Sequence, residues 1–482
     1  MAEKIPFHKR KGYHWFVVGT VCIGAFMAAL DASIINVAMP TLSKGFSVGM
    51  DMVEWVSIAY LLTLTSLLTL LGSLSDRIGR KLFYTVGFAI FGVGSGLCGI
   101  APTIQILVGA RVLQALGAAM LQANSIAIIT SAVPATCRGK AIGIQGSAQA
   151  IGLSIGPTVG GLLIANFGWR LIFDVNIPVA IVGTLLATVI LPRDMPNPHS
   201  KRFDYLGAVL FTPALILLVL IFKDGYKVGW TSSEIIMECI GVIIFLALFV
   251  WREKKCNNPM IDLRLLKIKT FTSGNITGLL SYSLMFGVLF LMPFYLDWIM
   301  KLNSLYTGLI LTVVSLAMFV MSPMSGAIAD RIGARILTSC GMAIASLGSI
   351  VLITLSQRSS IFIDLLGLAM VGLGMGMFTP PNNSSVMGSA PPEHIGVAGG
   401  ILNMSRSLGM SMGVALAGTL YNSDLNSFHL IKHTLNGARI LAFHVGFEGM
   451  SLLGIIATLM CVFIYNRSQP NKLDTSEYVS IH

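Results

Sequence analysis

Two ionisable side chains, Asp31 and Arg111, stand inside long apolar stretches of this chain, where a charge is costly. Asp31 precedes Pro40 by nine residues, and Arg111 follows the start of its own stretch by about eight. If both stretches are helices, a rise of about 1.5 Å per residue places both side chains roughly 12 to 13 Å from the same end. Pairing would lower the cost of each charge. The carboxylate can then bind a proton or a cation; the alternative is a structural ion pair between two helices.

Other charged residues in or beside apolar stretches have different expected roles. Arg406 lies eleven residues, or about 16 Å, into the stretch that begins at residue 395. It can orient polar partners, face a water-filled cavity or only bridge two helices. Asp174, Glu238, Asp364 and Glu448 lie near the starts of apolar stretches, where the helix dipole and free amides favour a carboxylate. We expect a structural role for these four acids, and Asp174, Asp364 and Glu448 are secondary candidates for a proton site.

A short pattern, Gly-x-x-x-Asp-Arg-Ile-Gly followed by basic residues, occurs twice, 254 residues apart. The first copy comprises Gly72, Asp76, Arg77 and Gly79, followed by Arg80, and the second comprises Gly326, Asp330, Arg331 and Gly333. The acid can pair with arginines or lie at a helix N-terminus, and so hold two helices in one conformation. The alternative is a tight turn that serves as a basic membrane anchor. Two copies in matching places favour a conformational latch and two related halves.

A glycine-rich stretch occurs further along the chain. Gly152, Gly156, Gly160 and Gly161 fall at near-helical spacing and would give a smooth face that another helix can approach closely. Pro157 removes a backbone donor and loosens the helix. We interpret the stretch as a pivot; ordinary packing of small residues is the alternative.

The composition of the chain indicates what kind of structural elements hold these charged and glycine residues in position. The chain is 55% hydrophobic and 11% charged, with a mean hydropathy of +0.80, whereas soluble domains carry about 25% charged residues. The net charge of +11 does not indicate a nucleic-acid partner, because the basic residues cluster beside apolar stretches. Seven dispersed cysteines without a CxxC motif indicate packing residues rather than a disulfide or metal framework.

The sequence therefore predicts an all-α integral membrane protein with fourteen transmembrane helices. Their expected ranges are 13–40, 53–74, 82–101, 103–130, 141–166, 171–191, 205–222, 235–250, 271–295, 305–328, 336–356, 361–380, 395–420 and 442–465. With the N-terminus inside, 22 Lys and Arg residues fall on the cytoplasmic side and 8 on the outer side. This bias predicts that both termini are cytoplasmic.

The position of the repeated pattern predicts the domain organisation. The first copy follows the second helix and the second copy follows the tenth, so two extra helices must lie between the halves. The helices at 205–222 and 235–250 are that pair, and we expect them to be peripheral. The predicted domains are an N-terminal six-helix bundle at 1–192, two inserted helices within 193–270, and a C-terminal six-helix bundle at 271–482.

Several motifs together resemble a known family. They are the repeated turn, Leu30–Pro40, Arg111–Gly117, Gly152–Gly161 and Trp169–Pro178. This combination resembles the 14-helix drug:proton antiporters of the major facilitator superfamily, which include quaternary-ammonium efflux pumps. The resemblance implies the major facilitator fold and a coupling or substrate site formed by Asp31, Asn36, Arg111, Gln114, Asn403 and Arg406. Asp174, Asp297 and Ser407 depart from the family pattern, which leaves the substrate open.

The resulting functional hypothesis is proton-coupled efflux of lipophilic, often cationic, compounds by alternating access. The alternatives are a dedicated exporter of one metabolite or lipid-like molecule, and a non-transporting membrane sensor or scaffold. The chain has no Walker sequence, HExxH motif or nucleophile elbow, so we expect neither direct ATP use nor an enzyme. No cofactor or metal is expected. The expected partners are small substrates, protons and the bilayer of the cell membrane, and a periplasmic adaptor is left open.

Overall fold

The computed structural model describes residues 12–134, 137–192, 204–229, 231–256, 263–391, 395–431 and 435–464. All regular elements in these ranges are helical, which confirms the predicted all-α class. The helices are α1 (Tyr13–Phe46), α2 (Met50–Ile78), α3 (Arg80–Gly99), α4 (Ile104–Ala132), α5 (Arg138–Phe167), α6 (Leu171–Asp174), α7 (Asn176–Ile190), α8 (Tyr205–Val228), α9 (Ser233–Lys255), η3 (Leu265–Lys267), α10 (Lys269–Trp298), α11 (Ser304–Ile332), α12 (Ala334–Ile353), α13 (Ile361–Ser389), α14 (Ile395–Ile431) and α15 (Leu435–Ile464).

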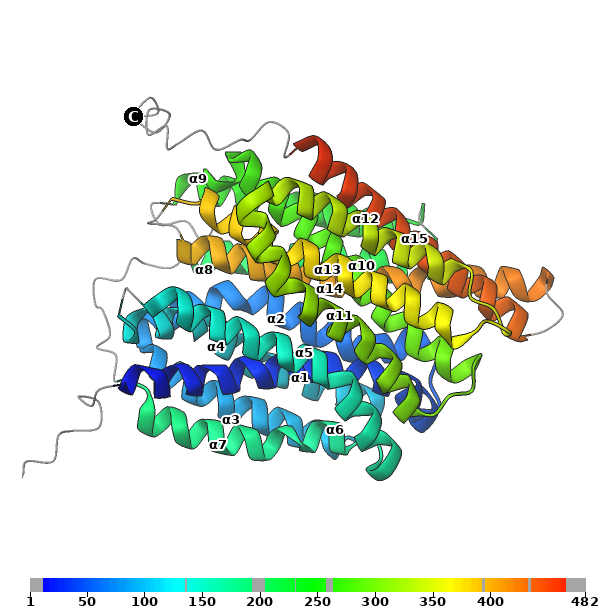
Figure 1. Cartoon of the computed structure of the whole chain (residues 1–482), viewed down its shortest axis with the longest axis horizontal. Helices are drawn as coiled ribbons and strands as arrows, with labels where there is room; N and C mark the ends of the chain where they lie inside the picture. The colour runs from blue at the N-terminus through cyan, green and yellow to red at the C-terminus, as the bar shows by residue number, and fades with distance from the viewer. Residues whose placement is uncertain are drawn as a thin grey trace, which may run out of the picture.

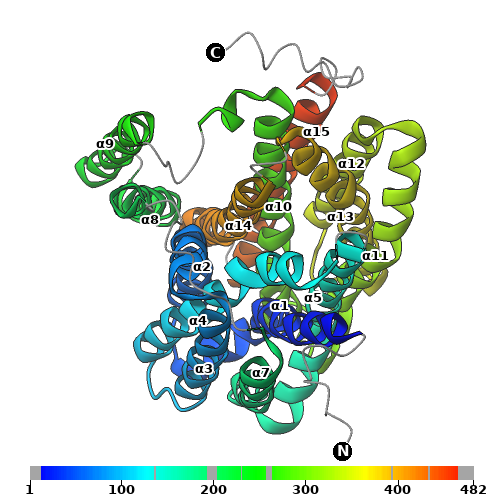
Figure 2. The ribbon, with the colours of Figure 1, turned by 90° about the vertical axis from the view of Figure 1, so that its left-hand side faces the viewer.

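The long helices run roughly alongside one another and form two groups (Figure 1). We call α1–α7 the N bundle, in which α1 packs on α5 and α3 packs on α4. The C bundle is α10–α15, in which α12 packs on α13 and α10 packs on α14. Helices α8 and α9 lie to one side, where α8 packs on α14 and α2 and α9 packs on α8 (Figure 2). The division of the chain at residues 192 and 270 stays a prediction.

The two halves repeat each other in helix length and in one turn. Helices α2, α3 and α4 have 29, 20 and 29 residues, and α11, α12 and α13 have the same three lengths. Gly79 ends α2 and precedes α3 with φ 120°, and Gly333 does the same between α11 and α12 with φ 88°. Glycine adopts positive φ without the steric cost of a Cβ atom. The repeated sequence pattern therefore builds the same turn twice.

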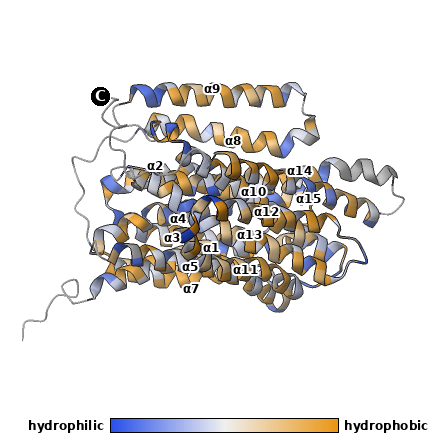
Figure 3. Cartoon of the chain, turned by 45° about the horizontal axis from the view of Figure 1, so that its top comes forward, coloured by the Kyte–Doolittle hydropathy of each residue, from blue (hydrophilic) through white to orange (hydrophobic). Residues whose placement is uncertain are grey.

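The helices have the length and composition of membrane spans. Among the described residues, thirteen segments are long and apolar enough to cross a bilayer, with α6 and α7 counted as one. Apolar residues continue along most helices, and the outermost helix, α9, is mainly apolar (Figure 3). Helix α14 is not among these thirteen segments. Its apolar sequence is interrupted by four polar residues, Asn403, Ser405, Arg406 and Ser407. These features show that the chain is a multi-pass membrane protein.

Several predicted helix boundaries were wrong by five residues or more: α1, α8, α9, α13 and α14 end later than predicted, and α15 begins earlier. Helix α1 continues through Pro40 to Phe46, because a proline can be accommodated inside a long membrane helix when neighbouring helices support it. The predicted helix at 171–191 is interrupted at Val175, between α6 and α7. Helix α15 begins at Leu435 rather than near 442, because its first residues are polar and hydropathy alone places the start too late.

The two bundles contact each other closely at the end where α1 finishes, which we call the closed end. There the Lys44 ammonium lies 2.7 Å from an Asp297 oxygen, and the Thr41 and Ser304 hydroxyls lie 3.5 Å apart. The Ser315 hydroxyl donates to the Leu153 carbonyl at 3.2 Å, so α5 and α11 are also joined. These contacts join the two bundles at the closed end.

Candidate functional site

A carboxylate, a guanidinium and three uncharged polar side chains form a buried network inside the N bundle. Asp31 of α1 accepts a hydrogen bond from Arg111 Nη1 of α4 at 2.6 Å. It also accepts from Gln114 Nε2 at 2.9 Å and from Asn176 Nδ2 of α7 at 3.1 Å. Gln114 in turn donates to the Ser95 hydroxyl of α3 at 2.8 Å. The pairing of Asp31 with Arg111 that the sequence predicted is confirmed, and both side chains are essentially inaccessible to solvent.

Arg111 is held by partners beyond Asp31. Its Nη1 also lies 2.6 Å from Gln114 Oε1, and its Nε donates to the Val56 carbonyl of α2 at 3.1 Å. The guanidinium stacks over the Tyr60 ring, 4.1 Å from its centroid. A buried ion pair is tolerable only when its remaining donors and acceptors are satisfied, and these contacts supply that satisfaction. The network therefore joins α1, α2, α3, α4 and α7 around one charge pair.

Sequence reasoning found part of this network. Gln114 was expected only from the family resemblance, while Ser95, Asn176 and the Val56 carbonyl were not identified as site residues. Asn176 lies in the Trp169–Pro178 motif, which was a usable signal. The depth argument was imprecise, because α1 extends beyond Pro40 and Asp31 is fifteen residues from its end. The pair forms because helix ends in a bundle need not lie at one level.

Asn36 lies on a different face of α1 from Asp31. With Ser33, it lines a small cavity of about 20 Å³ between the bundles, whose other walls include Pro157, Phe286 and Leu311. The sequence grouped Asn36 with Asp31, but the structure places Asp31 inside the N bundle and Asn36 at the seam between bundles. Helix α1 therefore connects the buried charge pair to the inter-bundle cavity.

Arg406 and Asn403 lie in the C bundle, apart from the Asp31 network. Arg406 of α14 is half-buried, and its Nη1 lies 3.5 Å from Asn403 Oδ1. Its guanidinium lies 5.6 Å from the ring centroid of Tyr282 on α10. Contact with an aromatic face favours a cation that is partly removed from water. These contacts link α14 to α10, as the helix-bridging alternative expects.

The three secondary acid candidates lie in three different environments. Asp174 is at the junction of α6 and α7 and lies against Gly99 at the end of α3. Asp364 is in the first turn of α13 but is fully buried, and neither carboxyl oxygen has a hydrogen-bond partner among the described residues. Asp364 therefore lies at a helix start, as predicted, but its carboxyl group is shielded from solvent.

Glu448 was also misplaced by the sequence. Because α15 begins at Leu435, Glu448 lies thirteen residues, or about 20 Å, into the helix. It is exposed rather than buried. The dipole argument for this acid therefore fails, because the effect of a helix N-terminus falls off within the first turn.

The first repeated turn holds the predicted ion pair. Arg80 Nε donates to Asp76 at 2.8 Å across Gly79, and the two side chains remain 29% and 48% exposed. Asp76 lies at the end of α2 rather than at a helix N-terminus, which settles its geometry as pairing with an arginine. Gly72 lies against Ala123 of α4, so α2 and α4 approach closely here. Arg77 lies in the last turn of α2.

In the second repeated turn, Arg331 is exposed next to Gly333. Asp330 is helical, but its side chain lies outside the described part of the structure. Both repeated turns therefore share the same backbone conformation, and the ion pair is described in the first turn.

The glycines of α5 form the smooth face that the sequence predicted. A Cβ atom on Gly152 would lie 2.6 Å from the Phe26 carbonyl oxygen of α1, and one on Gly160 would lie 2.8 Å from Ile34. Gly156 lies directly against Ser33 of α1. The face therefore lets α1 and α5 approach with almost no intervening side chain. Gly161 lies against Ser304 and Gly308 of α11, in the other bundle.

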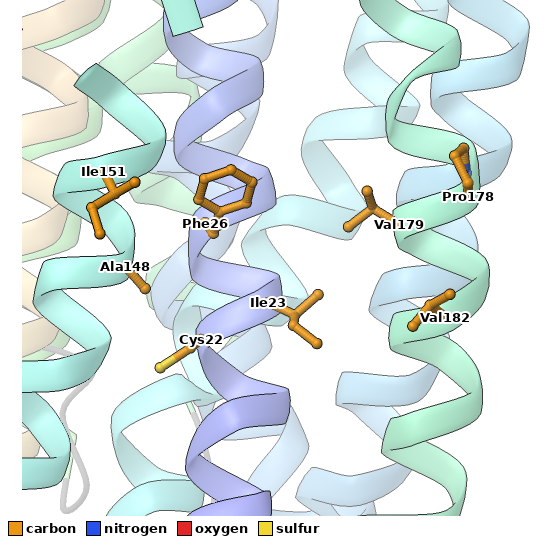
Figure 4. A pocket seen from close by; sticks show the side chains of 8 residues that line it. All are labelled: Cys22, Ile23, Phe26, Ala148, Ile151, Pro178, Val179 and Val182. Atoms are coloured by element: carbon orange, nitrogen blue, oxygen red, sulfur yellow. The ribbon is translucent and has the colours of Figure 1, made fainter. Parts of the chain in front are cut away.

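A larger groove lies on the surface of the N bundle between α1, α5 and α7 (Figure 4). Its volume is about 540 Å³, and its lining is Cys22, Ile23, Phe26, Ala148, Ile151, Pro178, Val179 and Val182. This apolar lining suits hydrocarbon rather than a charged group. Among the described residues, no cluster of His, Cys, Asp and Glu has the grouping needed to hold a metal ion.

Comparison with known families and proteins places these features in context. The family model described as Major Facilitator Superfamily matches residues 21–414. A riboflavin transporter, RibZ, from Clostridioides difficile is 33% identical over 455 residues, covering 94% of this chain and 98% of the relative. The multidrug resistance protein Stp from Mycobacterium tuberculosis is 35% identical over 406 residues, covering 84% and 75%. The methylenomycin A resistance protein from Streptomyces coelicolor is 28% identical over 417 residues, covering 86% of each chain.

Solved structures support the fold. A bacterial homolog of the human lysosomal transporter Spinster, in an inward-facing and unoccupied conformation, superposes with a TM-score of 0.68 at 15% identity and covers 96% of this chain and 100% of its own. The peptide transporter POT in complex with sulfate gives a TM-score of 0.68 at 14% identity, covering 93% and 94%. These similarities establish the arrangement of helices.

Proposed function

This chain belongs to the Major Facilitator Superfamily and is therefore a membrane transporter. We propose that it exports lipophilic, often cationic, compounds in exchange for protons. Relatives named as a multidrug resistance protein and a methylenomycin A resistance protein support this choice of substrate class. The energy source we propose is the proton gradient, with no cofactor. An inward proton contributes about 2.3 kcal/mol per 100 mV of membrane potential, before the pH difference is counted.

The observation that carries the proposal is the ion pair between Asp31 and Arg111. Charged residues in membrane spans are rare and are functional candidates by default. This pair joins several helices of one bundle, so a change in the charge of Asp31 acts on all of them. Protonation of Asp31 would remove the attraction to Arg111, while Gln114 and the Val56 carbonyl still satisfy the guanidinium.

We propose that α1 provides the coupling, because it lies between the charge pair and the cavity. In the proposed cycle, Asp31 is ionised and paired in one state and protonated in another, and the two states bind substrate differently. Asp31 faces α4 and α7, while Asn36 and Ser33 on the same helix face the seam between bundles. A shift of α1 that follows loss of the pair would change the substrate cavity without direct contact between proton and substrate.

A dedicated transporter of one small molecule is the second candidate. The similarity to a riboflavin transporter extends over nearly the full length of both proteins and favours it. Competition distinguishes the two candidates, because a multidrug site accepts chemically unrelated compounds and a dedicated site does not. Riboflavin transport in both directions should be measured alongside cationic dyes.

The test of the proposal is efflux of an ethidium-type dye from cells that express the protein, with and without a proton uncoupler. We expect efflux that stops when the uncoupler is added and slows when an unrelated lipophilic cation competes. Efflux that continues unchanged with the uncoupler would contradict proton coupling. Riboflavin movement without any dye efflux would favour the dedicated transporter.

A further inference from the structure

A second buried ion pair lies where three parts of the chain meet. The Lys223 ammonium of α8 is 3.3 Å from a carboxylate oxygen of Glu54 on α2, and both side chains are at most 2% exposed. Glu54 lies against Gly418 of α14, where any side chain would overlap with the carboxylate. Helix α2 belongs to the N bundle, α14 belongs to the C bundle and α8 is one of the two inserted helices. The pair therefore lies in the seam between the bundles.

The surroundings of Lys223 tie α8 to both bundles. Its ammonium lies 4.8 Å from the ring centroid of Trp55 on α2 and 3.4 Å from a carboxylate oxygen of its neighbour Asp224. The Thr419 hydroxyl of α14 is 3.0 Å from the Lys223 carbonyl oxygen, to which it can donate, and it also contacts the Phe222 carbonyl. Helix α8 packs more extensively on α14 than on α2. If the bundles separate, α8 should stay with α14 and the contact with Glu54 should break.

Alternating access in this fold occurs largely by rocking one bundle against the other. Glu54 is near the start of α2 and Lys223 near the end of α8, so both lie toward the closed end. We propose that Lys223 is a positioning residue of the transport cycle: from the inserted helix α8 it holds Glu54 in the seam, and the closed end opens when this pair separates. The proposal rests on family membership and not on the substrate or on proton coupling.

Removing one charge should therefore open the closed end. A buried charge that has lost its partner is costly in the closed state, whereas water can solvate it once the seam opens. Lys223→Gln should lower the closed-to-open ratio by about tenfold or more, and Glu54→Gln should lower it less, because Lys223 keeps Asp224 and the Trp55 ring. The double variant leaves no orphan charge and should recover much of the closed population.

The readout is cross-linking between Thr41→Cys and Ser304→Cys, whose native hydroxyls lie 3.5 Å apart at the closed end. The background protein has its seven native cysteines replaced. The matched control is Arg252→Gln, which breaks the pair with buried Asp204 between α9 and the start of α8 and should leave cross-linking unchanged. Single variants that fold and cross-link like the parent protein would overturn the proposal, and so would a double variant as open as the single variants.

A second experiment uses a covalent tether between the two positions, so it does not depend on a buried charge that has lost its partner. A reversible bifunctional thiol reagent joins Glu54→Cys to Lys223→Cys, and labelling is then measured at Thr312→Cys, in the closed seam opposite Thr158. Without the tether, labelling should proceed as the closed end opens; with the tether, it should nearly stop and return on reduction. An unchanged labelling rate in the tethered protein would overturn the proposal.

Discussion

At the scale of single residues, the organising feature is a charge pair that the bundle both isolates and satisfies. Asp31 accepts from three side chains, and Arg111 has a carbonyl, an amide oxygen and an aromatic face in addition to its acid. Breaking a buried pair by removing one partner costs about 3–5 kcal/mol, whereas replacing both partners is often nearly neutral. This asymmetry separates the structural role of the pair from its proposed role in coupling.

The first prediction uses that asymmetry. Asp31→Asn should destabilise the folded protein by about 3 kcal/mol, because Arg111 keeps its charge and loses its acid. The double variant Asp31→Asn with Arg111→Gln should recover most of that loss. Thermal unfolding in detergent, followed by the loss of monodisperse protein, measures both effects. A double variant less stable than the single variant would show that Arg111 is stabilised mainly by its other contacts.

At the scale of elements, close helix contacts and tight turns decide the geometry. Gly152, Gly156 and Gly160 bring α5 against α1, while Gly161 brings it against α11 in the other bundle. Helix α5 therefore packs on α1 through one side and contacts α11 of the C bundle through another. This geometry is consistent with the proposed pivot.

The second prediction concerns this face. Gly156→Ala should destabilise the protein by about 1–3 kcal/mol, because the new methyl group meets Ser33 where no space remains. Gly143→Ala is the control on the same helix, since a Cβ atom there has no neighbour within 4 Å. Thermal unfolding of both variants checks the prediction. Equal stability would mean that α1 and α5 can separate at little cost.

The third prediction concerns the turn between α2 and α3. Asp76 pairs with Arg80 on a partly exposed surface, so the pair adds at most about 1 kcal/mol to stability. Asp76→Asn should therefore leave folding and substrate binding near normal and slow the turnover of transport, because it biases one conformation. Binding and transport rates are measured on the same preparation. Weaker binding with normal turnover would argue against a latch.

Local patterns made some elements predictable and left others hidden. The repeated turns were predictable because glycine at a positive φ between charged residues leaves a sequence signature, seen at Gly79 and Gly333. The pairing of Asp31 with Arg111 was predictable because two opposite charges in apolar helices need each other. The pair formed by Glu54 and Lys223 was not predicted. Both residues lie near the ends of apolar stretches, where charges are ordinary.

At the scale of the whole molecule, two related bundles meet closely at one end, and the inserted helix α8 lies against their seam. Helix α9 is largely exposed, as a peripheral helix should be, but α8 delivers a buried lysine to the seam. Both inserted helices lie to one side of the bundles, but α8 also packs on α2 of the N bundle and on α14 of the C bundle. Helix α8 is therefore part of the packing between bundles.

The fourth prediction is topological. Both repeated turns lie at the end opposite the closed end, and the charge bias predicts that this end is cytoplasmic. Cysteines placed at Arg80 and Arg335 should resist an impermeant thiol reagent added to intact cells. Cysteines at Ser47 and Lys301, which follow α1 and α10, should react. Rapid labelling at position 80 or 335 would reverse the orientation.

The central claim is that Asp31 couples proton movement to export, and transport by Asp31→Asn in proteoliposomes with an imposed proton gradient tests it most directly. The protein should insert and bind substrate, yet gradient-driven transport should fall to the level of empty vesicles. Adding Arg111→Gln should restore stability without restoring transport. Near-normal, uncoupler-sensitive transport by Asp31→Asn would contradict the account and move the proton site to another acid, with Asp364 and Glu448 the next to examine.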